Sequence, residues 1–238
     1  MAYKRILLKL SGESLGDPDS GHGIDPDSVN RVARQVVAVV KTGVEVAVVV
    51  GGGNILRGAQ FSKIGANRAA ADTMGMLGTL INALALSEAI EREGGRPRVL
   101  SALDVHTVAE PFVRRRALSH LDAGKVVILA AGTGNPYFTT DTAAALRATE
   151  LDCEVLLKAT KVDGVYTADP KVDPTATRIE ELTYMDVLSN NLSVMDGTAI
   201  TLCKDHNLPV VVFDMFCDGN IERVVRGEKL GTTIRSDS

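Results

Sequence analysis

Short runs of aliphatic residues alternate with segments of helical periodicity along the chain, and this alternation constrains the fold more than any other feature. The run Glu45–Val50 is apolar after its first residue, as expected of a strand covered on both faces. Before it, Asp25-Pro26 is a helix-start signal, and apolar residues recur at helical spacing from Val29 to Val40, ahead of Gly43. Strands that alternate with helices predict an α/β protein with a mainly parallel sheet, whose ligands bind at the carboxyl ends of the strands.

The same pattern continues to the end of the chain without a repeat or an obvious linker, so we expect a single domain over residues 1–238. The expected strands are Tyr3–Leu10, Glu45–Val50, Val99–Ala102, Val126–Ala131, Val155–Ala159, Val210–Phe213 and Thr232–Arg235. The expected helices are the one that follows Asp25 and those over Asn67–Glu93, Val113–Leu121, Thr140–Leu151, Thr183–Ser189, Ala199–Asn207 and Ile221–Arg226.

The composition excludes several classes of protein. The net charge of −4 gives no overall attraction for nucleic acid or acidic membranes, so a phosphate site must be a local patch. The three cysteines include no Cys-x-x-Cys pair, which favours a reducing cytoplasm over a disulfide scaffold or a zinc site. Polar residues interrupt the apolar stretch Ala69–Ile90, which indicates a buried helix of a soluble protein rather than a membrane span.

Two polar turns follow predicted strands in the first part of the chain. Lys9 lies beside Ser11-Gly12, where an ammonium group can meet phosphates, although a lysine at the surface end of a strand is the simpler interpretation. Gly51–Gly53 follow a buried strand, so the backbone can approach a ligand and direct N–H groups at an anion. Arg57 adds a forked donor for phosphate oxygens. The second turn favours a phosphate site over a merely flexible loop.

A third segment, Gly132–Asp141, follows a strand and opens a helix. Thr139 or Thr140 can cap that helix, whose free N–H groups and dipole favour a bound phosphate. The aromatic pair Tyr137-Phe138 can pack against a base. Asp141 alone would be an ordinary acidic residue in a first helical turn, but the whole segment is difficult to explain as scaffold.

The fourth segment, Lys158–Pro170, is a polar loop after a strand, and its Tyr166 suits contact with a purine and ribose. Lys161 by itself is most simply a solvated charge. The sequence contains no Walker motif, no Gly-x-Gly-x-x-Gly after its first strand, no His-Glu-x-x-His and no Gly-x-Ser-x-Gly. These absences argue against a P-loop kinase, a dinucleotide enzyme, a zinc protease and a serine hydrolase.

Taken together and in this order, the four segments resemble the amino acid kinase superfamily over nearly the whole chain. Two of them, Gly132–Asp141 and the shorter run Asp72–Met76, are similar to its bacterial uridylate kinase branch in particular. The resemblance implies a three-layer α/β/α sandwich with a mainly parallel central sheet. It also implies ATP-dependent phosphorylation of UMP to UDP in pyrimidine nucleotide biosynthesis, with about residues 1–150 on the UMP side and about 151–238 on the ATP side.

The resemblance further implies a role for each matching residue. Those expected to contact ATP are Lys9, Leu10, Ser11, Gly12, Gly53, Arg57, Thr160, Tyr166 and Asp169. Those expected to contact UMP are Gly52, Asp72, Thr133, Gly134, Asn135, Pro136, Tyr137, Phe138, Thr139 and Thr140. Those expected to act in catalysis are Lys9, Arg57, Asp141 and Asp196. The two aspartates are expected to order Lys9 and the Mg²⁺ that accompanies ATP, and Asp72 to act on the ribose or to fix Arg57.

Regulation and assembly are implied in the same way. The resemblance indicates a cytoplasmic homohexamer that GTP activates and UTP inhibits. The polar loop Gly16–Gly23 matches a segment that the family links to GTP activation, and Arg98 and Lys125 are the basic residues expected to meet GTP.

The acceptor chemistry agrees with the residues present. A phosphate monoester has a second pKa of about 6, so it is mostly a dianion at neutral pH and needs no general base. Two alternatives remain open: another kinase of this fold acting on a carboxylate or carbamate, and a nucleotide-binding protein without catalysis. The presence of Lys9, Arg57, Asp141 and Asp196 favours catalysis over the second alternative.

Overall fold

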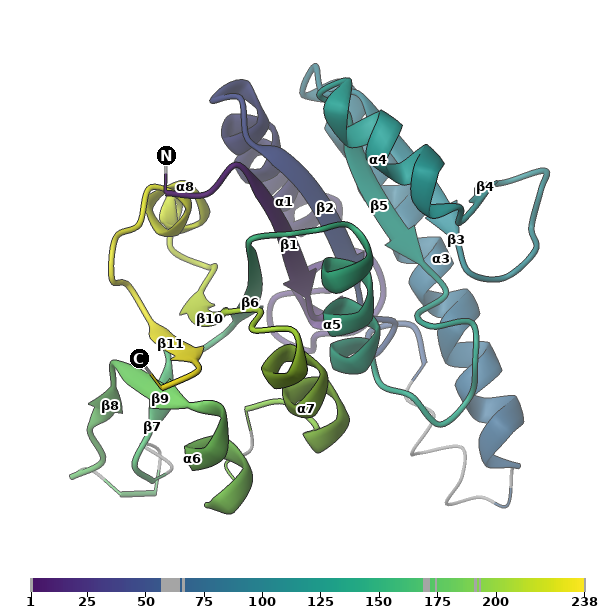
Figure 1. Ribbon diagram of the computed structural model, residues 1–238. Coiled ribbons are helices and arrows are strands. Elements are labelled where there is room, and N and C mark those ends of the chain that lie inside the picture. Colours follow the sequence, from purple (N-terminus) through teal and green to yellow (C-terminus); the bar gives the residue numbers. More distant parts are fainter. Residues whose placement is uncertain are drawn as a thin grey trace.

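A nine-stranded sheet runs through the molecule in the order β4-β3-β5-β2-β1-β6-β10-β11-β9 (Figure 1). The computed structural model describes residues 2–56, 65, 67–168, 172–173, 175–190, 192 and 194–237. The strands are β1 (Arg5–Leu10), β2 (Glu45–Val50), β3 (Pro97–Ser101), β4 (Glu110–Pro111), β5 (Val126–Ala130), β6 (Val155–Thr160), β9 (Glu181–Thr183), β10 (Val210–Asp214) and β11 (Thr232–Arg235). Of the strand pairs in this sheet over the described residues, only β10–β11 is antiparallel. The predicted, mainly parallel sheet is therefore confirmed.

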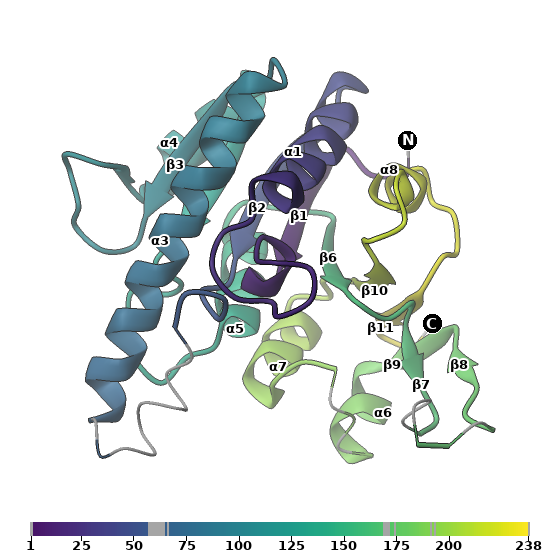
Figure 2. The same ribbon diagram turned by 180° about the vertical axis from the view of Figure 1, so that it is seen from behind.

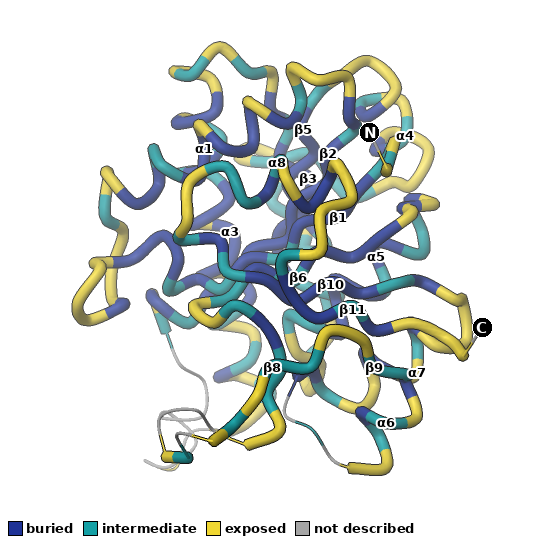
Figure 3. The backbone as a smooth tube through the Cα atoms, turned by 90° about the vertical axis from the view of Figure 1, so that its left-hand side faces the viewer, coloured by how far each residue is buried: buried dark blue, intermediate teal, exposed yellow. Residues whose placement is uncertain are grey.

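Helices cover both faces of this sheet and complete a three-layer sandwich (Figures 1 and 2). One face carries α1 (Pro26–Lys41), α3 (Arg68–Arg92) and α8 (Asn220–Val225), and the other carries α4 (Arg114–Asp122), α5 (Thr140–Glu150), α6 (Tyr184–Ser189) and α7 (Gly197–Asp205). Each layer has its own apolar core, and the central strands are the most continuously buried part of the chain (Figure 3). A short 3₁₀ helix, η1 (Gly12–Ser14), follows β1.

The alternation of side chains along β1 determines the face of the sheet to which the Lys9 side chain points. Leu8 and Leu10 pack into the core beneath α1 and α3, whereas Leu7 packs into the core on the α5 side. Successive side chains of a strand point to opposite faces, so Lys9 lies on the same face as Leu7, toward α5. This direction places an ammonium group in a largely apolar layer, where it requires an anionic partner.

The helix starts follow the expected capping chemistry. The Asp25 side chain accepts a hydrogen bond from the Ser28 N–H at 2.7 Å, and Pro26 occupies the first turn of α1. Beyond its C-terminus, Gly43 has a φ of 89°, a conformation that glycine adopts without steric cost. The Asn67 side chain caps α3 by accepting from the Ala69 N–H at 2.8 Å.

The long helix α3, predicted as a buried helix of a soluble protein, is buried along one side only. Met74, Leu77 and Ile81 expose 37%, 43% and 47% of their surface, because α1, β3 and β5 cover only one side of the helix. Among the described residues, α3 alone is long and apolar enough to cross a membrane, and half of its most apolar window is buried inside the molecule. Met74, Leu77 and Ile81 thus form an exposed apolar row on the outward side of α3.

The shortest strands were not predicted. β4, β9 and the separate antiparallel pair β7 (Val165–Tyr166) and β8 (Arg178–Ile179) contain two or three residues each. Such segments are too short to show a period of two, so the sequence gives no signal for them. β7 and β8 lie within or beside the polar loop that follows β6.

Candidate active site

The carboxyl ends of β1, β2 and β6 meet at one edge of the sheet. Lys9 of β1 is in register with Val49 of β2 on one side and with Lys158 of β6 on the other. Two lysines on adjacent strands at the same level project toward the same face. That face is covered here by the start of α5.

Asp141, in the first turn of α5, forms an ion pair with each of these lysines. The Lys9 Nζ lies 2.7 Å from Asp141 Oδ1, and the Lys158 Nζ lies 2.7 Å from Asp141 Oδ2. Lys158 also donates to the Val194 carbonyl. The three side chains expose only 12–15% of their surface. The cluster thus holds two ammonium groups and one carboxylate, which is a net positive charge at the end of the central strands.

Burial and pairing act in opposite directions on this cluster. Burial alone would raise the pKa of the Asp141 carboxyl group, but the two neighbouring ammonium groups outweigh it and hold that pKa below its ordinary value. Burial lowers the pKa of the Lys158 ammonium group, and the carboxylates of Asp141 and Asp196 oppose that effect. Asp141 is therefore ionised at neutral pH and suited to hold Lys9 in place.

Two glycine-rich turns lie against each other beside this cluster. The Gly51 N–H donates to the Leu10 carbonyl at 2.9 Å, which joins the end of β2 to the end of β1. A side chain at Gly12 would overlap the Asn54 amide oxygen and would lie 2.8 Å from the Gly51 carbonyl oxygen and 2.9 Å from the Gly53 nitrogen. Only glycine permits this approach. The turns form a backbone surface that suits an anion.

A cavity of about 410 Å³ opens beside these turns, between α3 and the loop before α5. Several residues predicted for UMP line it: Gly52, Asp72, Thr133, Asn135, Phe138, Thr139 and Thr140. Gly53, predicted for ATP, lines it too, whereas Gly134, Pro136 and Tyr137 do not. The structure thus brings most of the predicted acceptor residues together around one space.

Asp72 connects α3 to the loop that follows β5. Its carboxylate accepts a hydrogen bond from the Tyr137 N–H at 2.8 Å and pairs with Arg68 at 3.0 Å. Tyr137 has a φ of 73°, an uncommon conformation for a residue with a side chain, and its ring is 65% exposed. The Arg68 guanidinium carbon lies 5.9 Å from the centre of that ring. Of the aromatic pair, Phe138 therefore faces the cavity.

Asp196 occupies a different position from Asp141. It caps α7 by accepting from the Ala199 N–H at 3.0 Å, and it accepts further hydrogen bonds from the hydroxyl groups of Thr139 and Thr142. Thr139 in turn caps α5 by accepting from the Asp141 and Thr142 N–H groups. Asp196 consequently joins the starts of α5 and α7. The contact with Lys9 that orders the lysine comes from Asp141.

The residues predicted for adenosine lie on the other side of β1. The Thr160 hydroxyl donates to the Val162 carbonyl at 2.6 Å and ends β6, while the Tyr166 hydroxyl donates to Asp163 at 2.7 Å. Ser11 caps η1. Asp169, predicted for ATP, and Arg57, predicted for ATP and for catalysis, lie outside the described residues.

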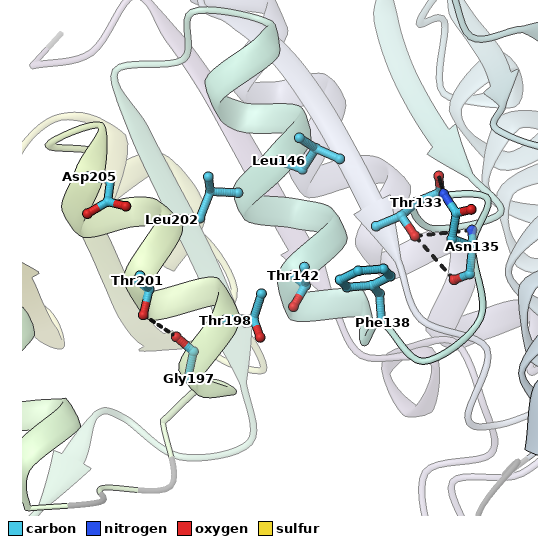
Figure 4. Close-up of a pocket in the computed structure, with 10 residues that line it drawn as sticks. All are labelled: Thr133, Asn135, Phe138, Thr142, Leu146, Gly197, Thr198, Thr201, Leu202 and Asp205. Atoms are coloured by element: carbon cyan, nitrogen blue, oxygen red, sulfur yellow. Dashed lines mark hydrogen bonds between the residues drawn. The ribbon is translucent and has the colours of Figure 1, made fainter.

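A second cavity, of about 700 Å³, lies between α5 and α7 (Figure 4). Thr133, Asn135 and Phe138 line both cavities, so the loop before α5 separates them. Away from that loop, the second cavity is lined by hydroxyl and apolar side chains of the two helices and by the Asp205 carboxylate. Gly52 and Gly53 of the turn after β2 line the first cavity and do not line the second, and we therefore assign the first cavity as the candidate site.

Arg98 and Lys125, predicted to meet GTP, lie near the far edge of the sheet at β3 and β5. A network around Glu110 joins them: Arg98 lies 3.9 Å from its carboxylate, and His120 contacts both that carboxylate at 3.2 Å and Lys125 at 3.3 Å. A cavity of about 500 Å³ is lined by Arg98, Glu110 and His106, among others. β5 and β2 separate this region from β1.

Within the described part of the chain, no cluster of three or more His, Cys, Asp or Glu side chains offers a metal site. Asp141 Oδ2 accepts from the Lys158 ammonium group, Asp141 Oδ1 is ion-paired with Lys9, and the Asp196 oxygens accept from hydroxyl and backbone N–H groups. Mg²⁺ in kinases is bound through one or two carboxylates together with substrate phosphates and water. The residues present therefore fit a metal that arrives with a nucleotide. The three cysteines are free, as expected.

Ammonium groups and backbone N–H groups around a space for phosphates define a phosphoryl-transfer site built without a P-loop. Comparison with known proteins identifies the class: a model described as the amino acid kinase family matches residues 4–214. The chain belongs to the amino acid kinase family.

Two solved structures are similar to the chain over its full length, and both are UMP kinases. The enzyme from Bacillus anthracis is 40% identical, with a TM-score of 0.96, and the match covers 100% of this chain and 98% of that one. The enzyme from Ureaplasma parvum is 37% identical, with a TM-score of 0.92, and the match covers 99% and 100%. At these identities the likeness extends beyond the fold to more than a third of the aligned residues.

Lys158 is the functional candidate that the sequence analysis missed. A signal was present, because Leu156-Leu157-Lys158 repeats the pattern Leu7-Leu8-Lys9. These tripeptides are the segments that pair in register in the sheet. The sequence does not show which strands pair, so the repeated pattern did not indicate that Lys9 and Lys158 lie side by side.

Proposed function

We propose that this chain transfers the γ-phosphoryl group of ATP to UMP, giving ADP and UDP, as a step of pyrimidine nucleotide biosynthesis. The observation that carries the proposal is the Lys9–Asp141–Lys158 cluster beside two glycine turns and a cavity lined by Asp72 and the loop before α5. The full-length likeness to UMP kinases supports the choice of acceptor.

The reaction requires little covalent chemistry from the protein. The acceptor phosphate, with a second pKa of about 6, is already a nucleophile at neutral pH. The barrier is the approach of two highly charged phosphates in line, so the protein's contribution is positioning and charge neutralisation. A site without an activated histidine or serine suits this chemistry.

Lys9 is the proposed contact for the transferred phosphoryl group. Asp141 holds its ammonium group at 2.7 Å and is itself held by Lys158. A lysine fixed in this way loses little freedom when the substrate binds, and its charge is available where negative charge moves in the transition state. The backbone N–H groups of Gly12, Gly52 and Gly53 add to this field. ATP brings Mg²⁺, which supplies further positive charge to the phosphates when it is bound.

Selection of uracil is proposed to involve the loop before α5. Thr133, Asn135 and Phe138 line the cavity and combine hydroxyl, amide and aromatic groups. A site that hydrogen-bonds a base rejects an analogue whose pattern leaves buried groups unpaired. The Thr160 and Tyr166 side of β6 is then proposed for adenosine.

We propose further that the protein is a cytoplasmic homohexamer which GTP activates and UTP inhibits. The exposed apolar row Met74, Leu77 and Ile81 on α3 supports a contact between subunits. The basic residues Arg98 and Lys125, joined through His120 and Glu110, support an anionic effector at the β3 edge.

The first experiment measures ADP release from Mg-ATP with UMP, CMP, dTMP or no acceptor, each with and without GTP. Release with UMP alone is the expected result, and GTP is expected to increase it. Glutamate, aspartate and carbamate are tested in parallel, because release with one of them instead of UMP would establish the rival kinase. A folded sample that binds ATP but releases no ADP with any acceptor would establish a non-catalytic nucleotide-binding protein.

A further inference from the structure

Two buried asparagines form a reciprocal pair beneath the glycine turn that follows β2. Asn82, in the middle of α3, has no exposed surface, and Asn54, at the end of the turn, is 3% exposed. The Asn82 Nδ2 donates to Asn54 Oδ1 at 2.7 Å, and the Asn54 Nδ2 donates to Asn82 Oδ1 at 3.0 Å. The pair is a direct connection between the helix and the turn.

Both amides use their remaining N–H groups on backbone carbonyls. The Asn82 Nδ2 also donates to the Gly51 carbonyl at 2.7 Å, and the Asn54 Nδ2 also donates to the Gly23 carbonyl at 2.6 Å. Each amide nitrogen has two N–H donors, so all four are used. Rotating either amide by 180° would place an oxygen against a carbonyl oxygen, and the observed arrangement is therefore the one that satisfies every group.

The pair also supports the turn that follows β1. Gly12 lies directly against the Asn54 amide oxygen, with no room for a side chain between them. The Gly51 N–H is bonded to the Leu10 carbonyl at 2.9 Å, so the two turns move together. A displacement of Asn54 or of the Gly51 carbonyl would shift the backbone N–H groups of both turns.

From these contacts we propose that Asn82 is a positioning residue for phosphoryl transfer, acting through Asn54 and the Gly51 carbonyl on the backbone that faces the phosphates. Asn82 is fully buried and lies behind the turn, so it acts without touching a substrate. The inference rests on the proposed kinase function. In-line transfer is sensitive to displacements of about 1 Å, which can cost about a hundredfold in rate.

The test is Asn82→Asp, which keeps the shape of the side chain but removes both N–H donors. We expect kcat per folded molecule to fall by about a hundredfold, as for a 1 Å misplacement. The KM for UMP is expected to stay within about threefold of wild type, because Asp72 and the loop before α5 are untouched and uniform binding is kept. Asn54→Asp should likewise lower kcat and leave KM for UMP nearly unchanged. The fold-decrease in kcat of the double variant should be much smaller than the product of the two single fold-decreases, because both variants break the same pair.

The matched control is Ile90→Ala, on the same helix and also fully buried, but packed near Val37 and Gly95 instead of the turn. It should lower the thermal unfolding temperature and leave kcat and KM of the folded fraction unchanged. The hydroxyl group of Asn82→Ser supplies one donor, so the kcat of this variant should lie between those of wild type and Asn82→Asp. If Asn82→Asp does not fold, the kcat of Asn82→Ser tests the positioning role instead.

The inference is overturned if a folded Asn82→Asp or Asn82→Ser variant keeps wild-type kcat, or if its kinetic changes match those of Ile90→Ala. If the wild-type chain phosphorylates UMP and these variants do so equally well, Asn82 is not a positioning residue, and the proposed kinase function still stands. A wild-type chain without kinase activity would instead overturn the proposed function, and the inference with it.

Discussion

Lys9, Asp141 and Lys158 show how three side chains from distant parts of the sequence define the chemistry of the site. Each lysine alone would be an expensive group to bury, and so would the aspartate. Together they satisfy one another, and the cluster retains one unbalanced positive charge. The site can therefore attract phosphate without the general base that other transferases use.

Lys9→Met tests the central contact. Removing the ammonium group removes a positive charge that stabilises the transition state more than the ground state, while Asp141 keeps its ion pair with Lys158. We expect kcat to fall by about a thousandfold, as for loss of a preorganised electrostatic contact, with UMP binding retained in equilibrium dialysis. Lys41→Met, at the exposed end of α1, should behave as wild type. Near-normal turnover of Lys9→Met would remove the proposed role.

Asp141→Asn tests the stability of the cluster. It leaves two largely buried ammonium groups without their carboxylate, which should cost about 3–5 kcal/mol of unfolding free energy at neutral pH. Since the ammonium groups hold the pKa of Asp141 below its ordinary 3.8, its stabilising charge is fully present above pH 3.8 and is lost as the pH falls through the folded-state pKa. The gap between variant and wild type should thus be constant from pH 7 to pH 5, as measured by urea unfolding, and narrow below pH 3.8. A gap that widens on acidification would contradict this assignment.

At the scale of elements, α3 acts as a common support for the turns at the end of two strands. Asp72 accepts from the Tyr137 N–H and Asn82 donates to the Gly51 carbonyl. Between them, Thr79 accepts at 2.7 Å from the N–H of Ala131, which has a φ of 63°. One helix thereby sets the distance between the turn after β2 and the loop after β5. Both line the candidate site.

Gly52→Ala and Gly53→Ala test how closely α3 approaches the turn. A Cβ at Gly52 would lie 2.6 Å from the Gly75 carbonyl oxygen and 3.0 Å from the Thr79 nitrogen, both in the backbone of α3. A Cβ at Gly53 would meet nothing within 4 Å. Overpacking should therefore destabilise Gly52→Ala by about 1–3 kcal/mol. Gly53→Ala should stay within about 0.5 kcal/mol of wild type. Equal thermal stability of the two variants would show that α3 can move away from the turn.

At the scale of the molecule, one sheet connects the two halves of the chain. β1 and β2 from the first half pair with each other, and β1 also pairs with β6 from the second half. The site lies at this junction, so the proposed acceptor and donor sides share one rigid scaffold. On the outward side of α3, Met74, Leu77 and Ile81 are exposed in the single chain.

Leu77→Glu combined with Ile81→Glu tests the proposed assembly. Two carboxylates in a row of apolar contacts would have to be desolvated in an interface, so we expect the native mass by light scattering to fall to that of a smaller species. Met185→Glu, which alters a residue with 49% exposure on α6, should leave the mass unchanged. An unchanged hexamer in the double variant would place the interface elsewhere, and a monomeric wild type would remove the hexamer proposal.

The sequence alone determined the elements whose signals are local. Strands β2 and β11 and the capped start of α1 were predicted with the bounds observed, because runs of apolar residues and Asp25-Pro26 act within a few residues of themselves. The helix predicted over Asn67–Glu93 is one residue shorter at each end in the structure, where Asn67 is the cap of α3. The glycine turns and the segment Gly132–Asp141 were also predicted, since they follow strands in the sequence, and the family resemblance added Asp72.

Only the tertiary structure decided the full set of charges that meet. The contact of Asp141 with Lys9 was expected from the family resemblance, but its second contact, with Lys158, depends on β1 and β6 being neighbours, although they are about 150 residues apart in the chain. The same is true of Asp196, which was expected beside Lys9 and caps α7 against Thr139, and of Asn54 and Asn82 beneath the glycine turn. Strand order and helix packing bring such groups together through long-range contacts, and these contacts cannot be predicted from the pattern of residues along the chain.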